Sequence, residues 1–277
     1  MSLVWQAQRV VTRTRERNLA REQLLAEAEA ELAKAHDMQM GLLPTDDVNI
    51  PRYDIASLCQ PATHVGGDFI KYAHHGRRFY VALADVTGHG MEAAIPVVMF
   101  SGILDNHLEE QIELTDRMPR LNRSMHRTLQ SRTFICCCLA EFDLNNFSVN
   151  LAMAGFPPTY HYDSRRRDLH ELTVSAFPLG LRKDASYETV ARPLKRGDYL
   201  VFCSDGFIEA EDPSGRILGY EQTASLISSV CSRRLTAQET LEAILADLDK
   251  HRDGAVQVDD ITCVVVRCTT EETVGGD

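Results

Sequence analysis

The chain of 277 residues contains no long hydrophobic run. Its longest apolar stretch, Ala93 to Phe100, has eight residues and is interrupted by Pro96. A transmembrane helix needs about 18 apolar residues, so no membrane span is expected. The first nine residues have no basic segment followed by an apolar stretch, and no secretory signal is expected either. With 44% hydrophobic and 25% charged residues, the composition excludes wholesale disorder.

Positive charge is also scarce. The 29 Lys and Arg residues face 40 Asp and Glu residues, which gives a net charge of −11. Such a surface repels phosphate backbones and argues against nucleic-acid binding. The sequence has no P-loop and no Gly-x-Gly-x-x-Gly motif that would indicate nucleotide binding. Carboxylates are, however, the ligands from which a site for hard divalent cations is built, and this chain has a surplus of them.

The eight cysteines lack any metal-binding or redox pattern. There is no Cys-x-x-Cys, and no Cys/His cluster has zinc spacing. Cys136, Cys137 and Cys138 follow one another in an apolar segment and are interpreted as small strand residues that pack. A metal or redox role is the less favoured alternative. Reduced cysteines predict a reducing compartment, the cytoplasm.

The first 40 residues contain neither glycine nor proline. Apolar and small residues recur there at alternating steps of three and four: Leu25, Ala28, Leu32, Ala35, Gln39 and Leu42. This spacing is typical of a coiled-coil seam, which Gly41 and Pro44 would end. We therefore predict a helical, coiled-coil-like linker over residues 1–44 that forms a homodimer and carries a signal from an upstream sensor domain. The alternative is a helix that packs on its own domain.

The remaining sequence predicts mixed α and β structure. Strands are expected at 53–59, 69–73, 79–85, 134–142, 147–153, 187–192, 199–203 and 261–267. Helices are expected at 91–113, 116–131, 220–233 and 237–252. Because strands come in clusters separated by helix pairs, the α+β class with antiparallel sheets is favoured. Asp143–Asn146 is expected to be a hairpin turn, and residues 269–277 an acidic tail.

Four short segments place acidic residues at predicted strand ends, most of them beside glycine. The acids are Asp68, Asp85, Asp205, Asp259 and Asp260. Carboxylates brought together raise one another's pKa unless a cation neutralises them. Oxygen ligands select magnesium or manganese over zinc, so the cluster predicts a two-metal site.

Each segment also has an ordinary interpretation. Asp205-Gly206 alone is a common turn, Asp259-Asp260 alone an exposed loop, and Gly88-His89-Gly90 a helix-entry turn. Gly66-Gly67-Asp68-Phe69 resembles the signature of diguanylate cyclases. That reading is rejected because Ile70-Lys71-Tyr72 follows and only 65 residues precede it. The combination of all four segments is what indicates a site.

Taken together, the segments resemble the metal-dependent serine/threonine protein phosphatases, the PPM family, in the bacterial branch typified by stage II sporulation protein E. The resemblance runs from about Asp37 to Arg267. Its motifs follow in family order: Gln39–Pro44, Gln60-Pro61, Val65–Phe69, Ala84–Gly90 with Ala93-Ala94, Ala154–Pro158, Pro178–Leu181, Gly197–Leu200, Ser204–Ala210 and Asp259–Thr262. It implies a PPM-type phosphatase domain over residues 45–268. The implied fold is a four-layer α-β-β-α sandwich of two antiparallel sheets flanked by helices.

The resemblance also implies a site with two divalent cations, manganese or magnesium. Asp85 would bridge the two metals, and the backbone carbonyl of Val86 would complete one site. Asp205 and Asp259 would complete the other.

Three further residues receive roles from the resemblance. Asp68 would act in the outer shell through metal-bound water, and Asp260 is the second choice for a ligand. His89 would protonate the leaving serine oxygen or hold a loop carbonyl. A hydroxide shared by the metals would attack phosphorus directly, without a phosphoenzyme.

The implied substrate is a phosphoserine or phosphothreonine protein, an anti-sigma-antagonist (anti-anti-sigma) domain. Two alternative functions are a catalytically silent PPM-fold binding module and a metal-dependent hydrolase of small phosphoesters or nucleotides. Lost aspartates would favour the silent module, and none is lost. Phe69-Ile70-Lys71, Phe156 and Thr63-His64 depart from the family pattern, which indicates unusual substrate contacts. No phosphate-gripping arginine is identified.

Overall fold

The computed structural model describes residues 3–44, 50–88, 90–130 and 132–269, with the side chains of residues 3–14, 16, 19 and 20 left undescribed. The chain divides into two compact units, Met1–Gly41 and Leu42–Asp277.

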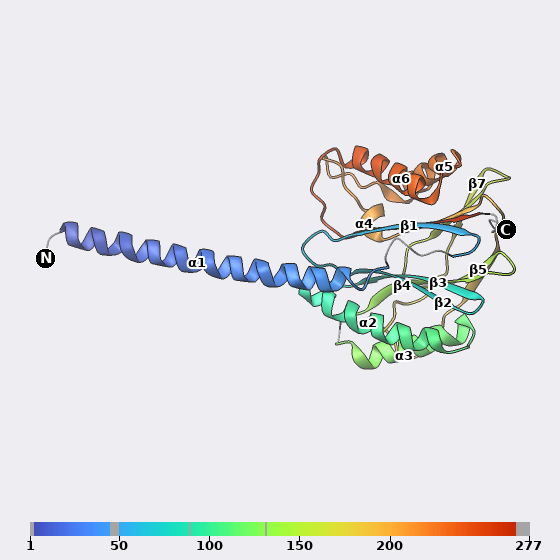
Figure 1. Ribbon diagram of the computed structural model, residues 1–277, viewed down its shortest axis with the longest axis horizontal. Helices are drawn as coiled ribbons and strands as arrows, with labels where there is room; N and C mark the ends of the chain where they lie inside the picture. Colours follow the sequence, from blue (N-terminus) through green and yellow to red (C-terminus); the bar gives the residue numbers. More distant parts are fainter. Residues whose placement is uncertain (1–2, 45–49, 89, 131, 270–277) are drawn as a thin grey trace, which may run out of the picture. The chain divides into compact units, whose positions relative to one another are not determined.

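The first unit is one helix, α1, which spans Leu3–Met40 (Figure 1). The N-terminal helix is thus present as predicted, and it ends directly before Gly41, whose amide donates to the Asp37 carbonyl at 3.0 Å. Helix residues 21–31 are all exposed, and Leu25 of the predicted seam exposes 53% of its surface. Dimerisation through this seam stays a prediction.

The second unit contains two five-stranded, wholly antiparallel sheets. Sheet A has the order β1 (Tyr53–Gln60), β10 (Ile261–Cys268), β9 (Tyr199–Cys203), β6 (Thr159–Asp163) and β7 (Asp168–Leu172). Sheet B has the order β2 (Asp68–His75), β3 (Arg78–Val86), β4 (Ile135–Asp143), β5 (Ser148–Ala154) and β8 (Thr189–Pro193).

Helices cover the outer face of each sheet (Figure 1). Sheet B is covered by α2 (Met91–Glu109) and α3 (Leu114–Thr128). Sheet A is covered by α4 (Asp205–Ile208), α5 (Gly219–Cys231) and α6 (Ala237–Arg252). The predicted four-layer α-β-β-α sandwich of the α+β class is confirmed.

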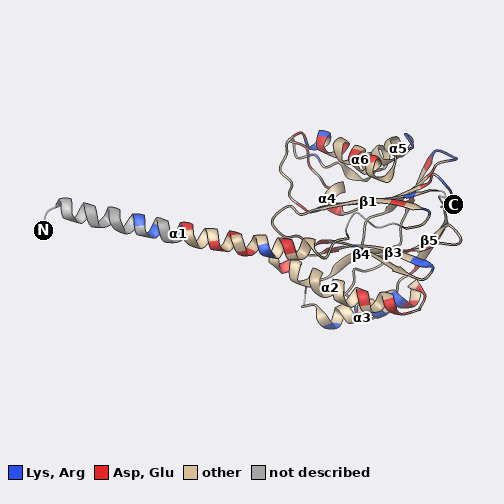
Figure 2. Cartoon of the chain, in the orientation of Figure 1, with Lys and Arg blue, Asp and Glu red and all other residues tan. Residues whose placement is uncertain are grey.

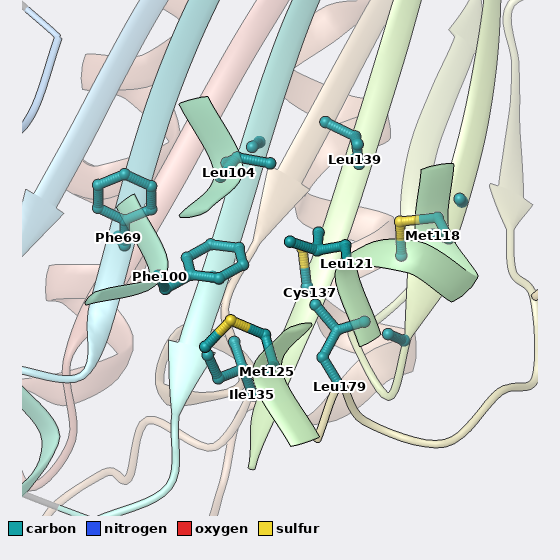
Figure 3. Close-up of a cluster of buried hydrophobic side chains, with 14 of the residues drawn as sticks. Phe69, Phe100, Leu104, Met118, Leu121, Met125, Ile135, Cys137, Leu139 and Leu179 are labelled. Atoms are coloured by element: carbon teal, nitrogen blue, oxygen red, sulfur yellow. The ribbon is translucent and has the colours of Figure 1, made fainter. Parts of the chain in front are cut away.

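Strict alternation along the central strands builds three cores. In β3, Phe79, Val81 and Leu83 point between the sheets. Their neighbours Tyr80 and Ala82 face α2 and α3, because successive side chains of a strand point to opposite faces. Figure 3 shows the core between sheet B and its helices, where large side chains of α2 and α3 meet those of the sheet. Each such side chain contributes roughly 1.5–3 kcal/mol by its burial.

All eight predicted strands are present, and sheet A contains two further strands, β6 and β7, that the sequence did not predict. Their sequences, Thr-Tyr-His-Tyr-Asp and Asp-Leu-His-Glu-Leu, show no clean apolar alternation. One buried polar group of β6 has a partner far along the chain: the His161 Nε2 and Asp198 Oδ2 atoms lie 3.1 Å apart. The predicted helix 91–113 ends at Glu109, and the next one begins at Leu114. The predicted hairpin turn is confirmed, since Asp143 Oδ1 accepts from the Asn145 amide at 2.8 Å.

Candidate active site

Two of the predicted acids lie in sheet B and face each other across neighbouring strands. Asp68 opens β2, and its register partner is Asp85 near the end of β3. Asp68 is only 5% exposed, and its Oδ2 atom is buried without a hydrogen-bond partner. A buried, unpartnered carboxylate oxygen is costly, so such an atom points to a missing ligand.

The other acids lie at the ends of two neighbouring strands of sheet A. Asp205 follows β9 by two residues and begins α4, while Asp259 and Asp260 directly precede β10. The two ends are tied together because the Ser204 hydroxyl donates to the Asp260 carbonyl at 3.2 Å. A Cβ atom on Gly206 would collide with that same carbonyl. Asp205-Gly206 therefore begins a helix in close contact with the second acidic segment, and is more than a simple turn.

The acids of the two sheets act on one another electrostatically. Burial first, and then the charges of Asp205, Asp259 and Asp260, raise the pKa of Asp85 to about 7. Burial and then Asp85 raise the pKa of Asp68 well above its ordinary value. The pKa values of Asp205 and Asp259 are also raised, by burial first and partly by neighbouring carboxylates. The acids of the four separated segments thus lie close enough together to raise one another's pKa, at an end that both sheets share.

Asp260 differs from its neighbour in its hydrogen bonds. Its Oδ1 accepts from the Ala62 amide at 2.8 Å, and its Oδ2 accepts from the amides of Gly67 and Asp68 at 2.6 and 3.3 Å. These bonds connect the start of β10 in sheet A to the loop that leads into β2 of sheet B. Asp259 is exposed, and its Oδ1 accepts from the Asp260 amide at 2.8 Å. The carboxylate of Asp259 therefore accepts fewer hydrogen bonds than that of Asp260, which leaves more of its lone pairs available to a ligand.

The glycines before Asp68 are required by close approach. A Cβ atom on Gly67 would lie 2.5 Å from the Val86 carbonyl oxygen and 3.2 Å from Asp85 Oδ1. A Cβ atom on Gly66 would collide with Asp260 Oδ2. The Val86 amide donates to the Gly67 carbonyl at 3.1 Å, which holds this loop against the end of β3. The glycine pair therefore serves to pack backbone against the carboxylates.

The donor chemistry of the cluster fits hard divalent cations. It consists of carboxylate oxygens and one nearby backbone carbonyl, and the Oδ2 atom of Asp68 still lacks a partner. Within the described residues, no three Asp, Glu, His or Cys side chains stand in a ready coordination arrangement. The side chains would have to move together around the ions. His89 lies outside the described residues.

Sequence reasoning missed two groups at this site. The Thr262 hydroxyl is buried without a partner and lies close enough to Asp68 to lower its pKa. Glu209 is close enough to Asp205 to raise its pKa. Both residues stood inside recognised segments. Glu209 is near Asp205 because the two are four positions apart on the turn of α4, whereas the nearness of Thr262 to Asp68 depends on contacts between distant strands. The strongest charge effects on the clustered aspartates come from other acids.

Comparison with known proteins places this geometry in context. The family model described as stage II sporulation protein E (SpoIIE) matches residues 75–269. The phosphoserine phosphatase RsbU of Bacillus subtilis is 27% identical over 241 residues, which cover 87% of this chain and 71% of RsbU. Stage II sporulation protein E of the same organism is 24% identical over 207 residues, 73% of this chain but only 24% of that protein.

Solved structures show the same fold. The SiaA-PP2C domain of Pseudomonas aeruginosa has a TM-score of 0.77 and 22% identity, covering 87% of this chain and 97% of that one. RsbX, crystallised in complex with magnesium, has a TM-score of 0.57 and 14% identity, with 78% and 94% coverage. At these identities the likeness shows the fold alone. Because the family model spans well over half of the residues, this chain belongs to the SpoIIE family of PPM-type serine phosphatase domains.

Proposed function

We propose that this chain hydrolyses phosphoserine or phosphothreonine on a regulatory protein. The observation that carries the proposal is the cluster of Asp68, Asp85, Asp205 and Asp259 at the shared end of the two sheets, with pKa values raised by burial and mutual repulsion. Carboxylates in that arrangement are costly to the fold unless cations neutralise them, so they are typical of a functional site.

Four groups would hold two divalent cations, manganese or magnesium. Asp85 would contact both, the Val86 carbonyl would complete one site, and Asp205 and Asp259 the other. Asp260 stays the second choice, because both of its oxygens already accept backbone amides. When bound, such cations lower the pKa of water and neutralise charge on phosphoryl oxygens.

The protein groups themselves have distinct tasks in this proposal. Asp68 keeps one buried oxygen available to accept a hydrogen bond from water in the site. Asp260 fixes the loop that carries Asp68, and the glycines before Asp68 bring backbone close to Val86. Rigid positioning of this kind lowers the cost of aligning the nucleophile with phosphorus. The protonation role of His89 stays a prediction.

The substrate we propose is a small anti-sigma-antagonist domain, on the strength of the likeness to RsbU. A helical homodimer through α1, an upstream sensor and a cytoplasmic location stay predictions. None of the described helices combines the length and apolar character needed to cross a membrane. The silent-module alternative is disfavoured because all five acids of the cluster are present.

Release of phosphate from p-nitrophenyl phosphate and from a phosphoserine protein tests this function. We expect turnover with manganese, none with a chelator, and a loss of several orders of magnitude in Asp85→Asn, because charge stabilisation disappears with the shared ligand. The circular dichroism spectrum of the variant should match the parent. Near-normal manganese-dependent turnover by Asp85→Asn would overturn the site assignment.

A further inference from the structure

A groove opens beside the carboxylate cluster on the sheet A side. Its lining includes Gly206 and Asp259 of the proposed site, and it encloses about 160 Å³. Pockets that bind small molecules are larger, roughly 300–1,000 Å³. The groove is therefore sized for one side chain of a larger partner and is continuous with the place where phosphate would be cleaved.

One wall of the groove is the segment that leads into β10. Val256 and Val258 are 84% and 72% exposed. Gln257 between them is anchored, since its Nε2 donates to the carbonyls of Gln60 and Asp259 at 2.9 Å each. Because successive side chains of an extended segment point to opposite sides, the two valines point to solvent while Gln257 holds the segment in place. Exposure of apolar side chains on an anchored wall is typical of a contact surface.

The opposite wall is a tight turn after α4. Glu211 pairs with Ile217 across this turn, and the Leu218 amide donates to the Ala210 carbonyl at 3.0 Å. The turn is held from within because Asp212 Oδ1 accepts from the Ser214 amide at 2.8 Å. Ile217 is 49% exposed and adds a third apolar side chain to the lining.

The charge of the groove is negative. Glu209 and Glu211 are exposed in its lining. The single basic side chain there, Arg252, is already engaged: it donates to the Ala255 carbonyl at 3.1 Å and lies 3.5 Å from an Asp249 oxygen. Two carboxylates are thus left facing an apolar wall, whereas Figure 2 shows charges of both signs mixed along the outer helices α3 and α6.

We infer that this groove binds the polypeptide that carries the phosphorylated serine, and that it takes a lysine or arginine close to that serine. The aliphatic stem would lie along Val256, Val258 and Ile217, while the charged end would meet Glu209 and Glu211. Long basic side chains bury their stems against apolar surface and keep the charge in polar surroundings. The inference rests on the proposed phosphatase function and adds the sequence preference of its substrate.

Charge reversal tests the groove. The probes are a phosphoserine peptide with lysines on both sides of the phosphoserine, the same peptide with glutamates, and p-nitrophenyl phosphate. We expect the parent to prefer the lysine peptide, and Glu211→Lys to lower kcat/KM for it about three- to tenfold while raising that for the glutamate peptide. Turnover of p-nitrophenyl phosphate should stay within twofold. Glu171→Lys, on edge strand β7 outside the groove, is the matched control and should change none of the three.

The apolar wall gives a second measurement. Val256→Ser and Val258→Ser should each raise KM for the lysine peptide about two- to fivefold, again sparing p-nitrophenyl phosphate. Equal kcat/KM for the two peptides, or equal losses on all three substrates, would overturn the inference and leave the phosphatase function intact. If no substrate is turned over, the phosphatase proposal fails, and anisotropy of the fluorescein-labelled lysine peptide still decides the groove. A Kd of Glu211→Lys for this peptide at least threefold larger than that of the parent supports the groove as a binding site, and an unchanged Kd overturns it.

Discussion

Alanine substitution of the two adjacent acids before β10 should separate a structural carboxylate from a metal ligand. Asp260 accepts from the amides of Ala62, Gly67 and Asp68, and two of these bonds are short, at 2.8 and 2.6 Å. Asp259 accepts from one amide, that of Asp260. A hydrogen bond to a charged group contributes roughly 1.5–3 kcal/mol.

In chelator, Asp260→Ala should therefore lower the free energy of unfolding by about 3 kcal/mol or more, because amides of the loop before β2 lose their acceptor. Relief of repulsion with nearby carboxylates offsets part of this loss. Asp259→Ala, the matched control, should cost less than about 1 kcal/mol, because its side chain is exposed and holds a single bond.

Saturating manganese should largely close the gap in stability between the two variants. A ligand at 100 times its dissociation constant stabilises the native state by about 2.7 kcal/mol. Asp260→Ala should retain most of such a shift, and Asp259→Ala should lose it. Urea unfolding followed by near-ultraviolet circular dichroism measures both, since all eight tyrosines lie in the unit from Leu42 to Asp277. If Asp260→Ala is as stable as the parent in chelator, or Asp259→Ala keeps the full manganese shift, the reasoning is refuted.

Two further predictions concern pH and the N-terminal helix. Because burial and neighbouring acids raise the pKa of Asp85 to about 7 in the folded chain, the native state binds more protons than the unfolded state between about pH 4 and 7. In chelator, the free energy of unfolding should fall as pH rises through that window, and manganese should make this dependence on pH weaker. Urea unfolding midpoints in chelator that rise with pH, or stay level, would contradict this. Leu32→Glu in the α1 seam should lower both dimerisation and activity, whereas Leu24→Glu, exposed and outside the seam, should change neither. Sedimentation measures dimerisation and phosphatase assays measure activity. If the two variants behave identically, the helix has no role in dimerisation or regulation and only links the domain to what precedes it.

The local sequence pattern predicted an element correctly where a strand is buried on both faces or where a turn is formed by bonds between neighbouring residues. Strands β3 and β10 are buried on both faces, so they appear in the sequence as near-continuous apolar runs. The turn after β4 forms through a bond from Asp143 to a residue two positions on, which is a local event. Helix α1 follows from the absence of glycine and proline before Gly41. The short strands β6 and β7 were not predicted because their sequences, rich in His, Tyr, Asp and Glu, show no clean apolar alternation.

The sequence by itself determined which residues come into question for the site: five carboxylates, placed at strand ends and most of them beside glycine, from which a site for hard cations is predicted. Only the tertiary structure decided what each carboxylate does. The antiparallel register sets Asp68 opposite Asp85, and the meeting of the two sheets turns Asp260 toward backbone amides and leaves its neighbour Asp259 exposed. The bonds of Asp260 span nearly 200 positions of chain, which no local pattern records, because the sheets bring these residues together only when the sandwich closes.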